Sequence, residues 1–260
     1  MNEQLTIFHF DEIQSTNTWL YDKMAVGENI AGMVAVAGYQ TAGRGMGKNK
    51  WESESGKNLL FSIALDVSYL KAENQFKISQ AVSVAIAECL EKVCGVKDIM
   101  VKWPNDIYHR DKKLAGILIQ NTINGIMMGT TIIGVGLNVN QTEFSSYLIN
   151  PVSLKNITGN DYNLDKLLNE LVAHIVEAIE LLRNLDETEN VDKKYISKLY
   201  RYQKWADYKY NGQVKSMIID GFDKYGRLLL HDREGADIIC DVKEIQFCQP
   251  SCPPDSEEGV

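Results

Sequence analysis

Two long apolar segments flank the dipeptide Asn124-Gly125, and this arrangement constrains the fold more than any other feature of the sequence. The segments are KLAGILIQNT, which opens at Lys113, and GIMMGTTIIGVGLNVN, which ends at Asn140. Asn-Gly between apolar runs is a strong signal of a tight turn, because both residues tolerate positive φ. The pattern therefore predicts an antiparallel hairpin.

Strands and helices alternate around this hairpin. Short apolar runs predict further strands at 5–10, 33–39, 58–67, 99–103 and 106–109. Helical spacing of apolar residues predicts helices at 75–93 and 163–185, and a shorter helix at 15–25 that Ser15 or Thr16 can cap. The charged segment 184–194 is interpreted as a connector. This order indicates an α+β domain with a mixed β-sheet flanked by helices.

The pattern changes at about residue 206. From there the sequence alternates with period two and carries turn signals such as Asn211-Gly212. We expect a small all-β barrel or sheet of four or five strands. The end of the chain is Pro-rich and acidic, which favours disorder. The expected domains are therefore 1–205, 206–250 and a disordered tail at 251–260.

Composition narrows the classes of protein that remain. The chain has 260 residues, of which 45% are hydrophobic, and no apolar run is long enough to span a membrane. Five cysteines without a C-x-x-C pair fit a reducing compartment. The net charge of −8 does not favour nucleic acid, which is bound largely through Lys and Arg. No secretory signal is visible, so we expect a cytoplasmic protein.

The segment QTAGRGMGKNKW, residues 40–51, combines three glycines with three basic residues. It matches neither the P-loop nor the dinucleotide fingerprint: Asn49 stands where the P-loop has Ser or Thr, and Lys48 stands where the dinucleotide pattern has its third glycine. The segment is therefore either an anion-binding loop of another kind or a solvated glycine-rich turn.

Three further stretches carry candidate chemistry. In KWPND, Lys102 could meet a phosphate and Asp106 could hold Mg²⁺, although the stretch could also be a hairpin corner. Lys113 opens a strand and could equally be a solvated lysine. In GVGLNVN, Asn138 could contact a nucleobase or ribose, while the glycines could serve packing. Together, with no evident nucleophile, they indicate phosphoryl or nucleotidyl transfer driven by charge neutralisation.

These motifs occur in a familiar order. STN at 15–17, the glycine-rich segment at 40–51, KWPND at 102–106, KLAGIL at 113–118 and GVGLNVN at 134–140 together resemble the bacterial biotin protein ligases. GFDKYGRLLL, at 221–230, is similar to the signature of their C-terminal domain. The resemblance covers roughly residues 5 to 250. It implies a catalytic domain like those of class II synthetases and lipoate ligases, followed by an SH3-like β-barrel.

The resemblance implies a two-step reaction. Biotin and MgATP would give biotinyl-5′-adenylate and pyrophosphate, and the biotinyl group would then pass to a lysine of a biotin carboxyl carrier protein or domain. Some family members carry an N-terminal DNA-binding domain, but here the first predicted strand begins close to Met1, so we expect no direct DNA binding. Family members often pair through an edge of the sheet, and the sequence leaves a homodimer open.

The resemblance also implies roles for individual residues. The biotin-binding set is Ser15, Thr16, Asn17, Gln40, Arg44, Gly45, Met46 and Lys113. The ATP- and adenylate-binding set is Gly43, Lys48, Trp51, Asn105 and Asn138, with Asp106 as a Mg²⁺ ligand. The catalytic set is Lys113, Arg44 and Lys102. The loop departs from the family at Met46, where some members have an arginine.

Two other functions compete with this interpretation. A lipoate or octanoate ligase or transferase shares the catalytic fold in outline, but the STN and KWPND motifs favour biotin. A non-catalytic biotin-sensing module would bind the vitamin without activating it. The presence of Lys113 and Asp106 favours an enzyme.

Overall fold

The computed structural model describes residues 5–47 and 49–249, and the chain divides into two compact units. The first unit ends at Lys198 and the second begins at Leu199, a few residues before the boundary expected at 205. The tail expected to be disordered, 251–260, lies outside the described residues. Each unit contains a sheet of its own, so each is described separately.

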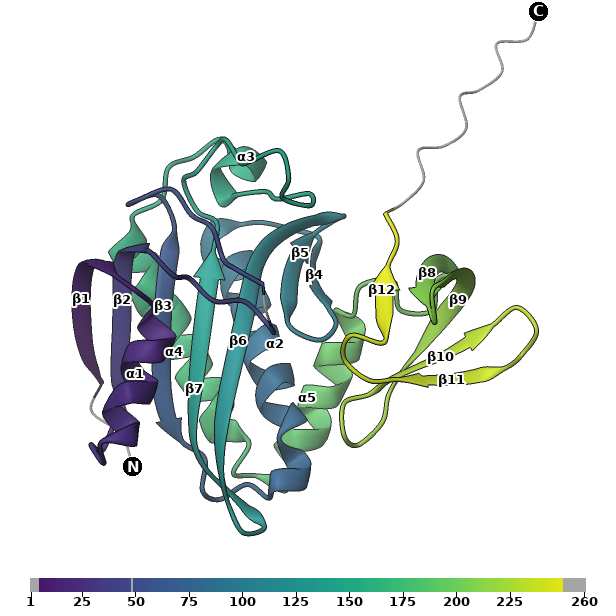
Figure 1. Cartoon of the computed structure of the whole chain (residues 1–260), viewed down its shortest axis with the longest axis horizontal. Helices are drawn as coiled ribbons and strands as arrows, with labels where there is room; N and C mark the ends of the chain where they lie inside the picture. Colours follow the sequence, from purple (N-terminus) through teal and green to yellow (C-terminus); the bar gives the residue numbers. More distant parts are fainter. Residues whose placement is uncertain (1–4, 48, 250–260) are drawn as a thin grey trace, which may run out of the picture. The chain divides into compact units, whose positions relative to one another are not determined.

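The first unit is built on a mixed sheet, as the sequence predicts (Figure 1). Among the described residues the sheet has seven strands in the order β1-β2-β3-β7-β6-β5-β4. β1 and β2 are parallel, and the other neighbours are antiparallel. The strands are β1 (Thr6–Ile13), β2 (Met33–Gln40), β3 (Leu59–Asp66), β4 (Ile99–Lys102), β5 (Asp106–His109), β6 (Lys112–Asn124) and β7 (Met127–Leu137).

Helices lie on both faces of this sheet. The ribbon shows α1 on one face, with α2, α4 and α5 on the other (Figure 1). Their bounds are α1 (Thr16–Ala25), α2 (Phe76–Cys94), α3 (Leu154–Thr158), α4 (Leu164–Leu181) and α5 (Leu185–Ser197), with a 3₁₀ turn at Ala72–Asn74. The expected helices at 15–25, 75–93 and 163–185 are confirmed, whereas α3 was not predicted.

The hairpin predicted around Asn124-Gly125 is confirmed as β6 and β7, and it lies inside the sheet. Gly125 has a φ of +63°, which a glycine adopts without steric cost. The register places Gly116 opposite Gly136 and Leu118 opposite Gly134. Directly opposed residues point to the same face of a sheet, so Gly116, Gly134 and Gly136 lie on one face.

The interpretation of 184–194 as a connector is wrong, because this segment forms α5. Val191 and Tyr195, one helical turn apart, are both buried, and the Tyr195 ring packs edge-on against Phe76 of α2 with centroids 5.7 Å apart. The charged side chains pair with α2 through Lys77–Asp192 (2.5 Å), Lys194–Glu88 (3.0 Å) and Lys198–Glu91 (2.8 Å). The charges thus belong to an amphipathic helix and not to a solvated linker.

The second unit contains an antiparallel sheet in the order β11-β10-β9-β8-β12 among the described residues. The strands are β8 (Ala206–Tyr210), β9 (Gln213–Phe222), β10 (Leu228–Asp232), β11 (Asp237–Cys240) and β12 (Ile245–Phe247). Asn211 and Gly212 link β8 to β9 with φ of +49° and +79°, as a two-residue hairpin of type I′ requires. The expected small β unit is thereby confirmed as a sheet.

None of the helices formed by residues 5–47 and 49–249 combines the length and the apolarity needed to cross a bilayer.

Candidate functional site

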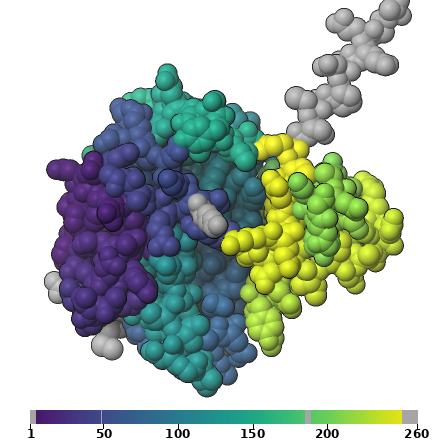
Figure 2. Space-filling model, in the orientation of Figure 1, coloured from purple at the N-terminus to yellow at the C-terminus, as the bar shows by residue number. Residues whose placement is uncertain are grey.

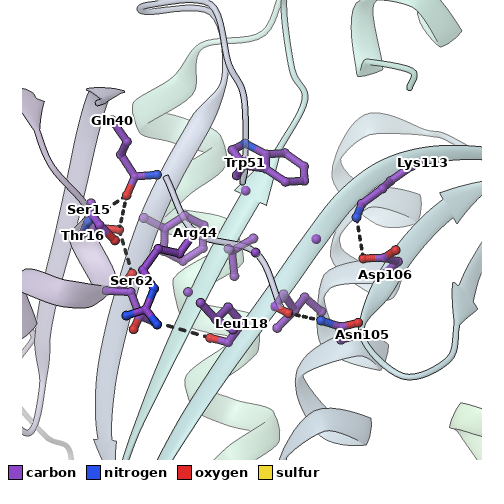
Figure 3. Close-up of a pocket in the computed structure, with 18 residues that line it drawn as sticks. Ser15, Thr16, Gln40, Arg44, Trp51, Ser62, Asn105, Asp106, Lys113 and Leu118 are labelled. Carbon is purple, nitrogen blue, oxygen red and sulfur yellow. Dashed lines mark hydrogen bonds and ion pairs between the residues drawn. The ribbon is translucent and has the colours of Figure 1, made fainter. Parts of the chain in front are cut away.

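Several segments of the first unit meet on the sheet face that carries α1 (Figure 3). They are the start of α1, the glycine-rich loop after β2, the turn between β4 and β5, and parts of the strands β3, β6 and β7. The space-filling view shows the loop, in dark blue, over the sheet between α1, in purple, and the β6–β7 hairpin, in teal (Figure 2). The segments enclose a cavity, here called the first cavity.

The first cavity collects most of the predicted site residues. Its lining includes Ser15, Thr16, Asn17, Gln40, Arg44, Gly45, Trp51, Asn105, Asp106 and Lys113, all of which the sequence predicts. It also includes Ser62, Leu118, Gly134 and Gly136, which had no predicted role. Among the described residues, Gly43 and Met46 do not line it, and Lys48 lies outside the described part of the chain.

The first turn of α1 forms one end of the cavity. The Ser15 hydroxyl accepts from the backbone N–H of Thr18 at 3.4 Å, which caps the helix. Thr16 donates its backbone N–H to Gln40 Oε1 at 2.8 Å, and its hydroxyl lies 2.8 Å from that of Ser62. Ser62 is fully buried in β3. A serine between the apolar residues LLF and IAL was the sequence signal that could have indicated its place in the site.

Asn17 supplies the polar group best placed to recognise a ligand. The side chain is 4% exposed, and its Nδ2 donates to the carbonyl of Leu118 at 3.5 Å. Its Oδ1 is buried without a hydrogen-bond partner among the described residues. A buried acceptor without a partner costs free energy, so a ligand that offers an N–H here would be favoured.

Glycines form the floor of the cavity. A Cβ atom on Gly136 would lie 2.4 Å from Cε2 of Trp51, and a Cβ on Gly116 would lie 3.0 Å from Cζ3 of the same ring. The indole of Trp51 therefore packs directly on the backbone of these two glycines, and a side chain at either position would crowd the ring. A Cβ on Gly134 would lie 2.9 Å from Nδ2 of Asn17.

The glycine-rich loop folds back on itself to deliver Trp51 to this floor. Arg44 and Lys50 form a β-bridge, and Gly45 donates its N–H to the carbonyl of Asn49 at 2.8 Å. Trp51 donates its own backbone N–H to the carbonyl of Gly43 at 3.0 Å. A Cβ on Gly43 would lie 2.6 Å from the carbonyl oxygen of Trp51, so this close approach requires a glycine.

The first residues of β5 and β6 supply charge. Lys113 Nζ lies 2.8 Å from Asp106 Oδ1 and 5.6 Å from the centre of the Trp51 ring, a cation–π distance (Figure 3). Asn105 is held differently, because its Nδ2 donates to the carbonyl of Ile117 at 2.5 Å. Its side chain therefore fixes the β4–β5 turn to β6. Lys102 donates to the hydroxyl of Tyr108 at 3.0 Å.

A second cavity adjoins the first. Its lining includes Trp51, Asp106 and Lys113, which also line the first cavity, and adds Lys50, Lys102, Tyr108, Asn138 and Tyr147. Asn138 is 4% exposed and donates Nδ2 to the carbonyl of Val152 at 3.1 Å, so it also anchors the loop after β7. The two cavities thus meet where the indole, an ammonium group and a carboxylate come together.

The residues present fit a magnesium ion that is held mainly by phosphates. Among the described residues, no group of three His, Cys, Asp or Glu side chains is arranged to hold a metal. Asp106 is the carboxylate that faces both cavities. Mg²⁺ in nucleotide sites commonly takes one or two carboxylates and completes its shell with phosphate oxygens and water.

Comparison with known proteins identifies relatives of the whole arrangement. The model of the biotin/lipoate A/B protein ligase family matches residues 9–138. The bifunctional ligase/repressor BirA of Escherichia coli is 33% identical over 228 residues, which cover 84% of this chain and 67% of that protein. The human biotin–protein ligase is 32% identical over 232 residues, which cover 80% of this chain and 29% of that protein.

Solved structures share the fold. A biotin protein ligase from Aquifex aeolicus in complex with biotin and ATP superposes with a TM-score of 0.76 at 24% identity, covering 94% of this chain and 99% of that one. A Helicobacter pylori biotin acetyl coenzyme A carboxylase synthetase gives a TM-score of 0.63 at 23% identity, covering 91% and 100%. At these identities the likeness establishes the fold.

Proposed function

The chain belongs to the biotin/lipoate A/B protein ligase family, and from this premise we propose that it attaches biotin to a carrier protein in two ATP-dependent steps. In the first step, the biotin carboxylate attacks the α-phosphate of ATP, forms biotinyl-5′-adenylate and releases pyrophosphate. In the second, the ε-amine of a carrier lysine attacks the acyl carbon, an amide forms and AMP leaves. The carrier is a biotin carboxyl carrier protein or domain.

The observation that carries this proposal is the shared wall of the two cavities. Trp51, Asp106 and Lys113 line both, so a ligand in each cavity would meet at one ammonium group. Adenylation requires that meeting, because a carboxylate and a phosphate must come into contact although both are anions. Charge placed in advance at such a point is worth most where water is excluded.

The first cavity suits biotin better than lipoate. The ureido ring of biotin offers N–H donors, and the buried Oδ1 of Asn17 is an acceptor without a partner among the described residues. The dithiolane ring of lipoate has no N–H and would leave this acceptor unsatisfied. Ser15 and Thr16 place further hydroxyls at the same end, next to Gln40.

Basic residues would stabilise the charge that develops during adenylation. Lys113 would contact the carboxylate and the α-phosphate, while Arg44 at the edge of the first cavity would contact the acyl phosphate. Lys102, in the second cavity, would face the phosphates that leave as pyrophosphate. Removal of one such group from a preorganised site commonly costs 10²- to 10³-fold in rate, roughly 3–4 kcal/mol.

The nucleotide would occupy the second cavity. Trp51 would pack near the adenine and Asn138 near the adenosine, with Gly43 and Lys48 contributing from the loop. Asp106 would supply a ligand for Mg²⁺, which would neutralise the phosphates when bound. The second unit, with its antiparallel sheet, is proposed to be the SH3-like domain of the family and to assist ATP binding or carrier docking.

The test is pyrophosphate release by the purified full-length chain. With MgATP we expect release that depends on biotin and not on lipoate, followed by the addition of one biotinyl group to a carrier domain in a mass spectrum. Lys113→Ala should lower the release rate by at least about 10²-fold, because the two anions would then meet without the ammonium.

Lys112→Ala is the matched control, since Lys112 is adjacent and exposed. It should retain the wild-type rate. Biotin binding without any pyrophosphate release would contradict the enzyme and leave a biotin-sensing module. An equal loss in the two lysine variants would remove Lys113 from the mechanism.

A further inference from the structure

Two amide side chains, Asn58 and Gln141, form a hydrogen-bond network with the segment that follows Trp51. Asn58, at the entry to β3, is 2% exposed and uses both ends of its side chain. Its Nδ2 donates to Ser53 Oγ at 2.9 Å and to Gln141 Oε1 at 2.6 Å. Its Oδ1 accepts the backbone N–H of Val139 at 2.8 Å.

Gln141 extends the network to the loop. Its Oε1 also accepts the backbone N–H of Glu54 at 3.0 Å, and its Nε2 donates to the carbonyl of Glu143 at 2.7 Å. The side chains of Asn58 and Gln141 therefore hold the two residues that end the segment from Trp51 to Glu54. Networks whose members are all satisfied rigidify the segments they join.

The other end of the network holds the strand that carries the glycine floor. Val139 follows β7 by two residues, and β7 contains Gly136, on which the indole of Trp51 rests. Asn58 thus connects the segment that follows Trp51 to the segment that follows Gly136. Its position is suited to set where the ring lies over its floor.

We infer that Asn58 is a positioning residue that fixes Trp51 between the two cavities and thereby sets the distance between the biotin carboxylate and the nucleotide. This inference rests on the proposed function for its catalytic consequence, but not for the placement of the ring. Asn58 lines neither cavity, so it acts on the ligands through the segments that it holds. Reacting groups misplaced by about 1 Å can cost 10²-fold in rate.

The placement of the ring can be measured without any activity. The chain has four tryptophans, so 5-fluorotryptophan labelling should give four ¹⁹F resonances, and Trp51→Phe assigns the one from Trp51. In Asn58→Ala we expect this resonance to shift or broaden while those of Trp19 and Trp103 stay unchanged. The kcat for pyrophosphate release should fall about tenfold or more, as expected for misplaced reactants.

In Asn58→Ala the fold-change in biotin affinity should be smaller than the fold-change in kcat, because the substitution leaves the contacts at Asn17 and Gln40 intact. The matched control is Asn140→Ala. The Asn140 side chain also makes two hydrogen bonds to backbone, but both are with Tyr162, outside the segment from Trp51 to Glu54. It should lower stability while the Trp51 resonance and kcat stay at wild-type values.

Gln141→Ala replaces Asn58→Ala if the latter does not fold. It removes the acceptor that Glu54 and Asn58 share and the donor to Glu143, but it leaves the hydrogen bonds of Asn58 to Ser53 and Val139. A wild-type Trp51 resonance with an unchanged kcat in the folded variant would overturn the inference. Equal effects of the Asn58 and Asn140 variants would reduce Asn58 to general stability. If the wild-type chain released no pyrophosphate, the proposed function would fail, and the fluorine spectrum would still decide the position of the ring.

Discussion

Gly134 and Gly136 are two positions apart on β7 and lie on the same face of the sheet, yet a different neighbour leaves no room for a side chain at each position. A Cβ on Gly136 would meet Cε2, Cδ2 and Nε1 of the Trp51 ring at 2.4 to 2.7 Å. A rigid ring cannot yield locally and must be displaced as a whole. A Cβ on Gly134 would meet the amide end of Asn17 at 2.9 Å, and that end can rotate away.

Alanine substitutions at these two positions should therefore have different effects, one on biotin binding and the other on the rate of pyrophosphate release. Gly134→Ala should weaken biotin binding by about tenfold, the scale of one hydrogen bond, because it displaces the Asn17 amide. Gly136→Ala should displace Trp51 and slow pyrophosphate release at saturating biotin. Labelled-biotin binding and pyrophosphate release measure the two effects, and the same pattern in both variants would contradict the separation.

At the scale of the element, α5 shows how a charged segment can be structural. Among the side chains of α5 that the structure describes, Val191 and Tyr195 are buried. Tyr195 is large and wholly buried, and it packs against Phe76 on α2. The ion pairs to α2 add orientation more than stability, because surface pairs contribute about 0–1 kcal/mol each.

Tyr195→Ala should therefore destabilise the first unit. We expect a loss of about 3–5 kcal/mol in the free energy of unfolding, as for other large aromatic side chains removed from a core. Biotin affinity of the folded variant should persist, since α5 lies on the sheet face opposite the first cavity (Figure 1). Denaturant titration measures the loss, with the exposed Lys193→Ala as control. Equal stability of the two variants would restore the connector interpretation.

At the scale of the molecule, both cavities of the candidate site belong to the first of the two units. Every described residue that lines the first or the second cavity lies before Lys198, where the first unit ends. The second unit begins at Leu199 and has its own sheet and its own buried residues, such as Tyr208 and Leu228. We therefore propose that the first unit carries biotin recognition.

Deletion of residues 199–260 tests this division. The shortened chain should fold cooperatively and bind labelled biotin with an affinity close to that of the full chain. Transfer of biotin to a carrier domain should fall, because we propose that the second unit assists ATP binding or carrier docking. Loss of biotin binding by a folded truncation would contradict the first expectation, and undiminished transfer would contradict the second.

The sequence by itself determined the features that depend on neighbours a few residues away. A helix cap such as Ser15 acts within three residues, and the Asn211-Gly212 turn depends on backbone freedom at two positions. The motifs also selected many of the residues that line the first cavity, such as Asn17 and Lys113. The sequence pattern did not predict α5, because the helix depends on the burial of Val191 and Tyr195 and on the packing of Tyr195 against Phe76 of α2, which the polar sequence does not indicate.

Only the tertiary structure decided how the selected residues meet. The hydroxyl pair of Thr16 and Ser62, and the tie from Asn58 to Gln141, join residues far apart in the chain. So does the seat of Trp51 on Gly136. Such contacts arise from the order and register of the strands, which are set by burial of the whole sheet. Local preference acts over single turns and cannot fix them.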